Sequence, residues 1–112
     1  MERNPRYRLY KNMAKDIKTI AKNYFIALKR RKILARQELR ECLEVEDDFE
    51  RHIRKVRAAY NQLDALEKTF INNDFFYQNY PEWWKDSFSK TTYYRLRRQS
   101  MIHFKEVFDN EA

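Results

Sequence analysis

The residues with the clearest chemical potential lie near the C-terminal end of the sequence, between Lys90 and Lys105. This stretch contains no acidic residue, whereas arginine, threonine and tyrosine are frequent. Its apolar side chains recur at helical spacing, which predicts an amphipathic helix over about residues 91–109. The expected buried stripe is Tyr93, Leu96, Ser100, Met101, Phe104, Val107 and Phe108. The opposite face would then present cations and hydroxyl groups, mostly near the N-terminal end of the helix.

That opposite face has the chemistry needed to recognise DNA. A guanidinium group can bind guanine through two hydrogen bonds, and hydroxyl groups can bind phosphates or base edges. A recognition helix presents its N-terminal residues to the major groove. We therefore expect major-groove contacts from Lys90, Thr91, Thr92, Tyr94, Arg95 and Arg98, with Arg97 binding phosphate at the side.

A helix-turn-helix requires a second helix immediately before the recognition helix. Pro81 suits the first turn of such a helix, because its missing N–H group costs nothing there. Trp83, Trp84 and Phe88 would make this short helix strongly apolar. Ser89 is of a residue type that caps the next helix well. The sequence therefore predicts a C-terminal helix-turn-helix.

The same region resembles a known family. Residues 66–71 read Leu-Glu-Lys-Thr-Phe-Ile, and residues 83–98 read Trp-Trp-Lys-Asp-Ser-Phe-Ser-Lys-Thr-Thr-Tyr-Tyr-Arg-Leu-Arg-Arg. This pattern is similar to the fourth region of bacterial sigma factors. It is more similar to the ArpU-type regulators of phage late genes and to small mollicute proteins of that type. The resemblance covers roughly residues 51–109 and departs from the family pattern at residues 72–80.

The resemblance implies a sequence-specific transcription regulator. In such proteins the residues that match positions 89–98 of this chain contact DNA. The implied partners are double-stranded DNA and RNA polymerase. A dimer would recognise two half-sites about one helical turn apart, whereas a sigma-like monomer would recognise an asymmetric site.

Composition favours an all-α protein that binds polyanions. The 112-residue chain contains no glycine, which disfavours tight hairpins, so we expect a small helical bundle. Its formal net charge of +7 favours nucleic acid first and an anionic membrane surface second. No apolar run is long enough to span a bilayer or to serve as a signal peptide. Because Cys42 is the only cysteine, no intramolecular disulfide can form, and we expect a cytoplasmic protein without a membrane partner.

Residues 1–46 are predicted to form a basic amphipathic helical region that precedes a helix-turn-helix domain over 47–112. From about Arg6 an apolar stripe runs through Tyr10, Met13, Ile17, Ile20, Tyr24 and Leu28. The dense basic run that follows is Lys29, Arg30, Arg31 and Lys32. The helix either passes through this run or breaks there, and the run is either an auxiliary nucleic-acid contact or a solvated face. The region could support the DNA-binding motif, form a homodimer or contact RNA polymerase.

A second amphipathic stripe occupies the middle of the sequence. Asp47 or Asp48 would suit the N-cap of the helix that this stripe predicts. It either continues to about Ile71 or breaks near residues 61–64, where Asp64 and Glu67 have the spacing of a capping box. We expect the helix to end at residues 72–74, followed by a loop whose aromatic residues fill the core.

The sequence predicts no enzyme. A chain without glycine has no glycine-rich phosphate loop, and no serine or cysteine has an evident base partner. The acidic residues lack histidine or cysteine neighbours at metal-ligand spacing, so we expect no metal and no cofactor. Two rival hypotheses remain: a protein-interaction module centred on the aromatic residues 75–84, and an RNA-binding protein that uses residues 29–32.

Overall fold

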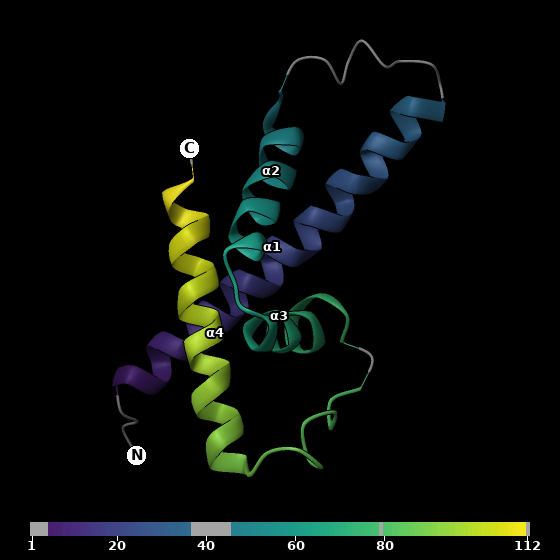
Figure 1. Cartoon of the computed structure of the whole chain (residues 1–112). Helices are drawn as coiled ribbons and strands as arrows, with labels where there is room; N and C mark the ends of the chain where they lie inside the picture. The colour runs from purple at the N-terminus through teal and green to yellow at the C-terminus, as the bar shows by residue number, and fades with distance from the viewer. Residues whose placement is uncertain (1–4, 37–45, 79, 112) are drawn as a thin grey trace.

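The computed structural model describes residues 5–36, 46–78 and 80–111. These residues form an all-α fold without a β-strand, as predicted. The elements are α1 (Pro5–Arg36), α2 (Asp48–Asn61), α3 (Ala65–Ile71), the π-helical segment η2 (Asn72–Phe76) and α4 (Lys90–Asn110) (Figure 1).

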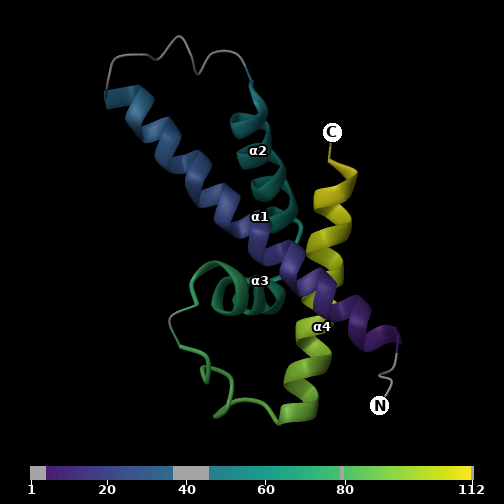
Figure 2. The same cartoon turned by 180° about the vertical axis from the view of Figure 1, so that it is seen from behind.

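The first helix is the longest element, and the other helices pack against it. It continues without interruption through residues 29–32, so the alternative of a break there is wrong. The C-terminal half of α1 lies beside α2, and its N-terminal half crosses α4 (Figures 1 and 2). Two ion pairs, Arg30–Asp47 and Arg31–Glu50, join α1 to the start of α2.

The boundaries of α2 and α3 follow local capping rules. The Asp47 carboxylate accepts a hydrogen bond from the Glu50 N–H over 2.9 Å, so Asp47 is the N-cap of α2. At the start of α3, the Asp64 side chain accepts from the Glu67 N–H, and the Glu67 side chain accepts from the Asp64 N–H. This capping box confirms a helix break before Ala65.

The end of α3 differs from the sequence expectation. Residues 72–74 do not end the helix; they continue it as the π-helix η2, which is closed by a 2.7 Å bond from the Tyr77 N–H to the Asn72 carbonyl. The wider π-turn changes the direction of the side chains that follow. It places Phe75 in the core, with 2% of its surface exposed, and directs the Asp74 carboxylate toward α4.

The expected helix over residues 81–88 is also wrong. Residues 81–87 form consecutive turns with bonds from the Trp83 N–H to the Tyr80 carbonyl and from the Lys85 N–H to the Glu82 carbonyl. This segment is as long as α3, so its length alone does not explain the absence of a helix. Its aromatic side chains instead bond and stack with η2, α3 and α4, which fixes a different backbone path.

One hydrophobic core connects α1 with the rest of the described chain. It contains Ile17 and Ile20 from α1 together with these residues from the other elements: Val56, Ala59, Leu63, Ile71, Phe75, Met101, Phe104 and Phe108. The predicted division at residue 46 stays a prediction. In the stripe of α4, Tyr93, Ser100, Met101, Phe104 and Phe108 are buried, whereas Leu96 and Val107 are half-buried.

None of the helices in the described ranges contains an apolar stretch of the length that a bilayer crossing needs. Cys42 and its apolar neighbours Leu39 and Leu43 lie outside the described residues.

Candidate nucleic-acid interface

The candidate interface begins at the N-terminal end of α4, which projects from the helical bundle (Figure 1). Ser89 is the N-cap: its hydroxyl oxygen accepts from the Thr92 N–H over 3.2 Å and its O–H donates to the Thr92 hydroxyl over 3.0 Å. The remaining N–H groups of the first turn have no partner within the helix. Together with the helix dipole, they favour an anion such as phosphate at this end.

Four of the predicted contact residues are exposed at this end of α4. They are Lys90, Thr91, Tyr94 and Arg95. Among the described residues, no carboxylate forms an ion pair with Lys90 or Arg95. Thr92 is half-buried, and its hydroxyl and N–H groups are bound to Ser89. Both cations are therefore available to a polyanion without loss of an internal ion pair.

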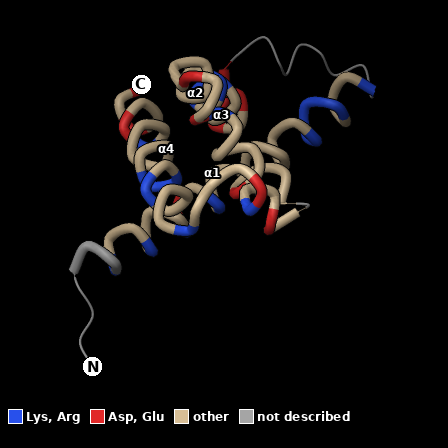
Figure 3. The backbone as a smooth tube through the Cα atoms, turned by 60° about the horizontal axis from the view of Figure 1, so that its bottom comes forward, with Lys and Arg blue, Asp and Glu red and all other residues tan. Residues whose placement is uncertain are grey.

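Arg98 connects this surface to the N-terminal half of α1. Its guanidinium carbon lies 5.6 Å from the centre of the Tyr10 ring, and its side chain is half-buried. On either side of Tyr10, Arg8 and Lys11 are exposed on α1. Figure 3 shows Lys and Arg positions in blue both on α4 and on the N-terminal half of α1, where the two helices come close. The acidic residues of α4, Glu106 and Asp109, lie in its C-terminal half.

Arg97 points into the molecule rather than toward solvent. Its Nε donates to the Asp74 carboxylate over 3.0 Å, and its guanidinium carbon lies 4.9 Å from the centre of the Phe75 ring. Only 22% of the side chain is exposed. Phosphate binding by Arg97 stays a prediction, but this geometry favours a structural role for its guanidinium group.

Asp74 is the residue that holds the N-terminal half of α4 to the bundle. Its carboxylate is 8% exposed and accepts from three donors: the Trp83 indole N–H at 2.9 Å, the Tyr93 hydroxyl and the Arg97 guanidinium. Burial, followed by the hydrogen bond to Asp74, raises the pKa of the Tyr93 hydroxyl. No local sequence pattern indicates the role of Asp74, because its partners are remote in sequence.

An aromatic cluster supports the same half of α4. The Trp84 ring stacks on Tyr93 at a centroid distance of 4.2 Å, and Phe70 stacks on the same tyrosine at 5.7 Å. Trp83 lies edge-on to Phe70 at 5.0 Å. Much of the aromatic segment that the interaction hypothesis requires is therefore engaged internally. Tyr77 and Tyr80, 55% and 67% exposed, are its accessible rings.

The basic run on α1 is partly neutralised by acidic residues. The Arg31 guanidinium binds the Glu50 carboxylate, which lowers the pKa of Glu50, and Arg30 binds Asp47. Lys29 and Lys32 remain exposed. This run lies near the C-terminal end of α1, far from the N-terminal end of α4 (Figures 1 and 2). The two predicted basic sites are therefore separate surfaces.

No group of residues in the described part of the chain has the composition of a metal site. Comparison of the chain with protein-family models, with curated proteins and with solved structures finds no match. The function must therefore be inferred from the surface chemistry of the chain itself.

Proposed function

We propose that the chain is a DNA-binding transcription regulator that inserts the N-terminal half of α4 into the major groove. One observation carries the proposal. The exposed end of α4 presents Lys90, Thr91, Tyr94 and Arg95 together, and no acidic residue occurs between positions 90 and 105. A helix end of this composition offers donors to base edges and cations to phosphates on one continuous surface.

Each side chain has a specific role in this proposal. Arg95, one turn into the helix, reads a guanine through two hydrogen bonds, which would give about 1–3 kcal/mol of discrimination against another base. Lys90 and Arg98 neutralise phosphates on either side of the groove. Thr91 donates to phosphate, and Tyr94 offers both a hydroxyl group and an apolar ring to base edges.

The contacts around α4 would keep the proposed recognition helix rigid. Asp74 and the stacked rings of Trp84 and Tyr93 fix the N-terminal half of the helix against the bundle. Arg8 and Lys11 of α1 add sequence-independent contacts to phosphate. A helix that is already fixed in place does not have to be ordered on binding, so less of the interaction energy is lost as entropy.

The connection between α3 and α4 differs from that of an ordinary helix-turn-helix. Residues 72–89 join the two helices, whereas the motif normally uses a turn of three or four residues. The proposal therefore depends on the surface of α4 and not on the spacing of a helix pair. Contact with RNA polymerase and homodimerisation through α1 are further proposals that the resemblance to sigma-like regulators motivates.

The direct test is selection of binding sites from random duplex DNA with the purified chain at two salt concentrations. We expect a recovered motif that contains guanine, with affinity that falls steeply as salt increases. A palindromic motif would indicate a dimer, and an asymmetric motif would indicate a monomer. Retention of DNA without any motif, or no retention at either salt concentration, would contradict the proposal.

A further inference from the structure

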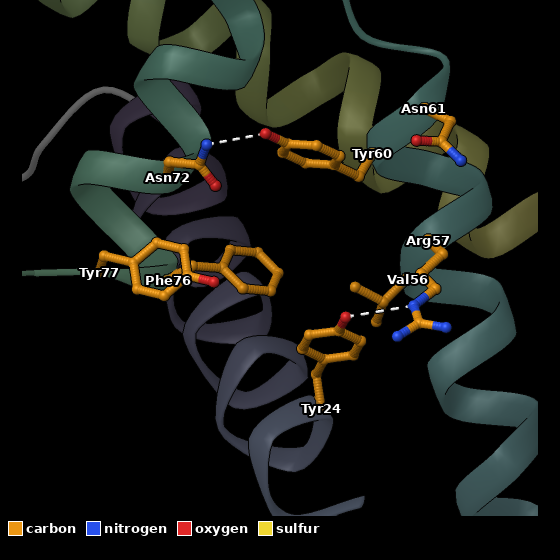
Figure 4. A pocket seen from close by; sticks show the side chains of 8 residues that line it. All are labelled: Tyr24, Val56, Arg57, Tyr60, Asn61, Asn72, Phe76 and Tyr77. Atoms are coloured by element: carbon orange, nitrogen blue, oxygen red, sulfur yellow. Dashed lines mark hydrogen bonds between the residues drawn. The ribbon is translucent and has the colours of Figure 1, made fainter. Parts of the chain in front are cut away.

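A cavity of about 310 Å³ opens between α2 and η2, with α1 beneath it (Figure 4). None of the described residues that line it belongs to α4, so the cavity has no part in the proposed DNA contacts. The described lining residues are Tyr24, Val56, Arg57, Tyr60, Asn61, Asn72, Phe76 and Tyr77. The volume is at the lower end of the range for small-molecule sites, which suits a ligand with a single ring.

The walls of the cavity are mainly aromatic. Phe76 lies edge-on to Tyr24 at a centroid distance of 5.9 Å, and Figure 4 shows Tyr60 across the opening from these rings. Val56, 2% exposed, contributes apolar surface from α2. A flat apolar group can therefore contact ring faces and edges inside this space.

The polar groups of the cavity include several hydrogen-bond donors. The Tyr60 hydroxyl oxygen accepts from the Asn72 amide over 2.8 Å, and the Tyr24 hydroxyl oxygen accepts from Arg57 Nε over 3.4 Å. In both tyrosines the O–H proton itself meets no acceptor among the described residues. The side-chain amide of Asn61 also lines the opening. The cavity therefore offers several hydrogen-bond donors to an acceptor-rich ligand.

The charge of the cavity is positive. Arg57 is exposed at its rim, and within the described ranges no carboxylate pairs with its guanidinium group. None of the described lining residues is acidic. With Nε bound to Tyr24, the terminal nitrogens of the Arg57 guanidinium remain to donate to a carboxylate.

From these observations we infer that the cavity binds a small aromatic carboxylate. Its ring lies among Tyr24, Tyr60 and Phe76, and its carboxylate receives hydrogen bonds from Arg57 and from the tyrosine hydroxyl groups. Both the ring and the charge of the ligand are required, because the aromatic walls suit the ring and the guanidinium and hydroxyl donors suit the anion. This inference does not depend on DNA binding.

The position of the cavity links it to α4. Asn72 and Phe76 line the cavity, and Asp74, which holds Tyr93 and Arg97, lies between them in η2. A ligand that contacts η2 would therefore contact the same short element that fixes α4. Amide signals of Asp74 and Tyr93 should shift when the cavity is filled, together with those of the cavity itself.

The test is an NMR titration of the free, isotope-labelled chain with three probes: benzoate, its neutral analogue benzamide, and acetate. We expect saturable shifts at residues 57, 60, 72 and 76 with benzoate. Binding should be at least about tenfold weaker with benzamide, which lacks the charge, and with acetate, which lacks the ring. Equal binding of benzamide would overturn the role of the charge. Failure of benzoate to saturate at millimolar concentration would overturn the site.

Two substitutions complete the test. Arg57→Gln should weaken benzoate binding at least about tenfold, and Tyr24→Phe should weaken it while the ring remains in place. Arg51→Gln is the matched control, because Arg51 is exposed on the same helix but outside the cavity. Unchanged benzoate binding by a folded Arg57→Gln variant, or equal weakening by Arg51→Gln, would overturn the inference. Because no DNA is present, these outcomes are independent of the proposed function.

Discussion

Asp74 and Arg97 are 23 residues apart in sequence, yet the guanidinium Nε of Arg97 donates to the Asp74 carboxylate over 3.0 Å. The pair joins the π-helix η2 to the N-terminal half of α4. Only 8% of the Asp74 side chain and 22% of the Arg97 side chain are exposed. The position of the proposed recognition surface therefore depends on a shielded ion pair.

Asp74→Asn should destabilise the protein by about 3 kcal/mol, because it leaves the Arg97 charge largely buried without its counter-charge. It also places an amide donor among three existing donors. Urea unfolding followed by circular dichroism measures the loss. Asp86→Asn is the matched control, since Asp86 is exposed. Equal stability of the two variants would show that the Asp74 network contributes little.

Tyr93 makes the stability of the protein depend on pH in the alkaline range. Burial, and then the bond to Asp74, raise the pKa of Tyr93 above its usual value of about 10, so the unfolded chain releases this proton at lower pH than the folded chain. The stabilisation that this raised pKa contributes is complete below pH about 10. It is lost as pH rises through the folded pKa, by about 1.4 kcal/mol per pH unit.

Tyr93→Phe removes this dependence. The stability difference between the native chain and Tyr93→Phe should therefore shrink as pH rises from about 10 toward 11. Urea midpoints over that range measure it. The exposed Tyr80 supplies the control variant, Tyr80→Phe, for which we expect no such trend. A constant difference between the native chain and Tyr93→Phe would contradict the buried position of the Tyr93 hydroxyl.

Ser89→Ala should cost about 1 kcal/mol, because the first turn of α4 loses its side-chain cap. Fraying of that turn would also disorder Lys90 and Thr91, so DNA affinity should fall together with stability. Ser87→Ala serves as the control: Ser87 is exposed two residues earlier and does not cap the helix. The prediction is wrong if thermal unfolding and DNA titration give the same stability and the same DNA affinity for Ser89→Ala and Ser87→Ala.

Ile17 tests whether α1 is part of the same cooperative unit as α4. It is fully buried in the core that also contains Met101 and Phe104. Ile17→Ala should lower stability by about 2–5 kcal/mol, and tryptophan fluorescence and circular dichroism should report one coincident transition. Ile26→Ala, at a position 48% exposed on the same helix, should have a small effect. Two separate transitions would instead support an independent domain after residue 46.

Local chemistry allowed several features to be predicted from sequence. Asp47, Asp64 and Ser89 each cap the helix that follows them, as their residue types indicate. The periodicity of α1 and α4 predicts much of their buried faces, including Ile17 and Ile20 of α1, but Ala21 and Ala27 of α1 are buried outside the predicted stripe. These features depend on residues within one or two turns of each other.

The features that could not be predicted depend on contacts between distant residues. The π-helix after Ile71 is compatible with the burial of Phe75 and with the bonds of Asp74 to α4, which no local pattern encodes. The turns over residues 81–87 replace the expected short helix for the same reason, since Trp83 binds Asp74 and Trp84 stacks on Tyr93. The cavity lined by Tyr24 and Arg57 is formed by three elements and has no sequence signature.

The central claim is that the exposed end of α4 reads DNA sequence. It is tested most directly by the ratio of affinities for the selected duplex and for a scrambled duplex of equal length. The Lys90→Ala/Arg95→Ala variant removes two exposed cations from α4. The Lys29→Ala/Lys32→Ala control removes two exposed cations from α1, so both variants lose the same charge.

We expect the ratio to fall close to one for Lys90→Ala/Arg95→Ala, because this variant loses the contacts to bases. The ratio should stay at the native value for Lys29→Ala/Lys32→Ala, even if both of its affinities decrease together through lost phosphate contacts. A native ratio in a folded Lys90→Ala/Arg95→Ala variant would contradict the claim that α4 is the recognition helix.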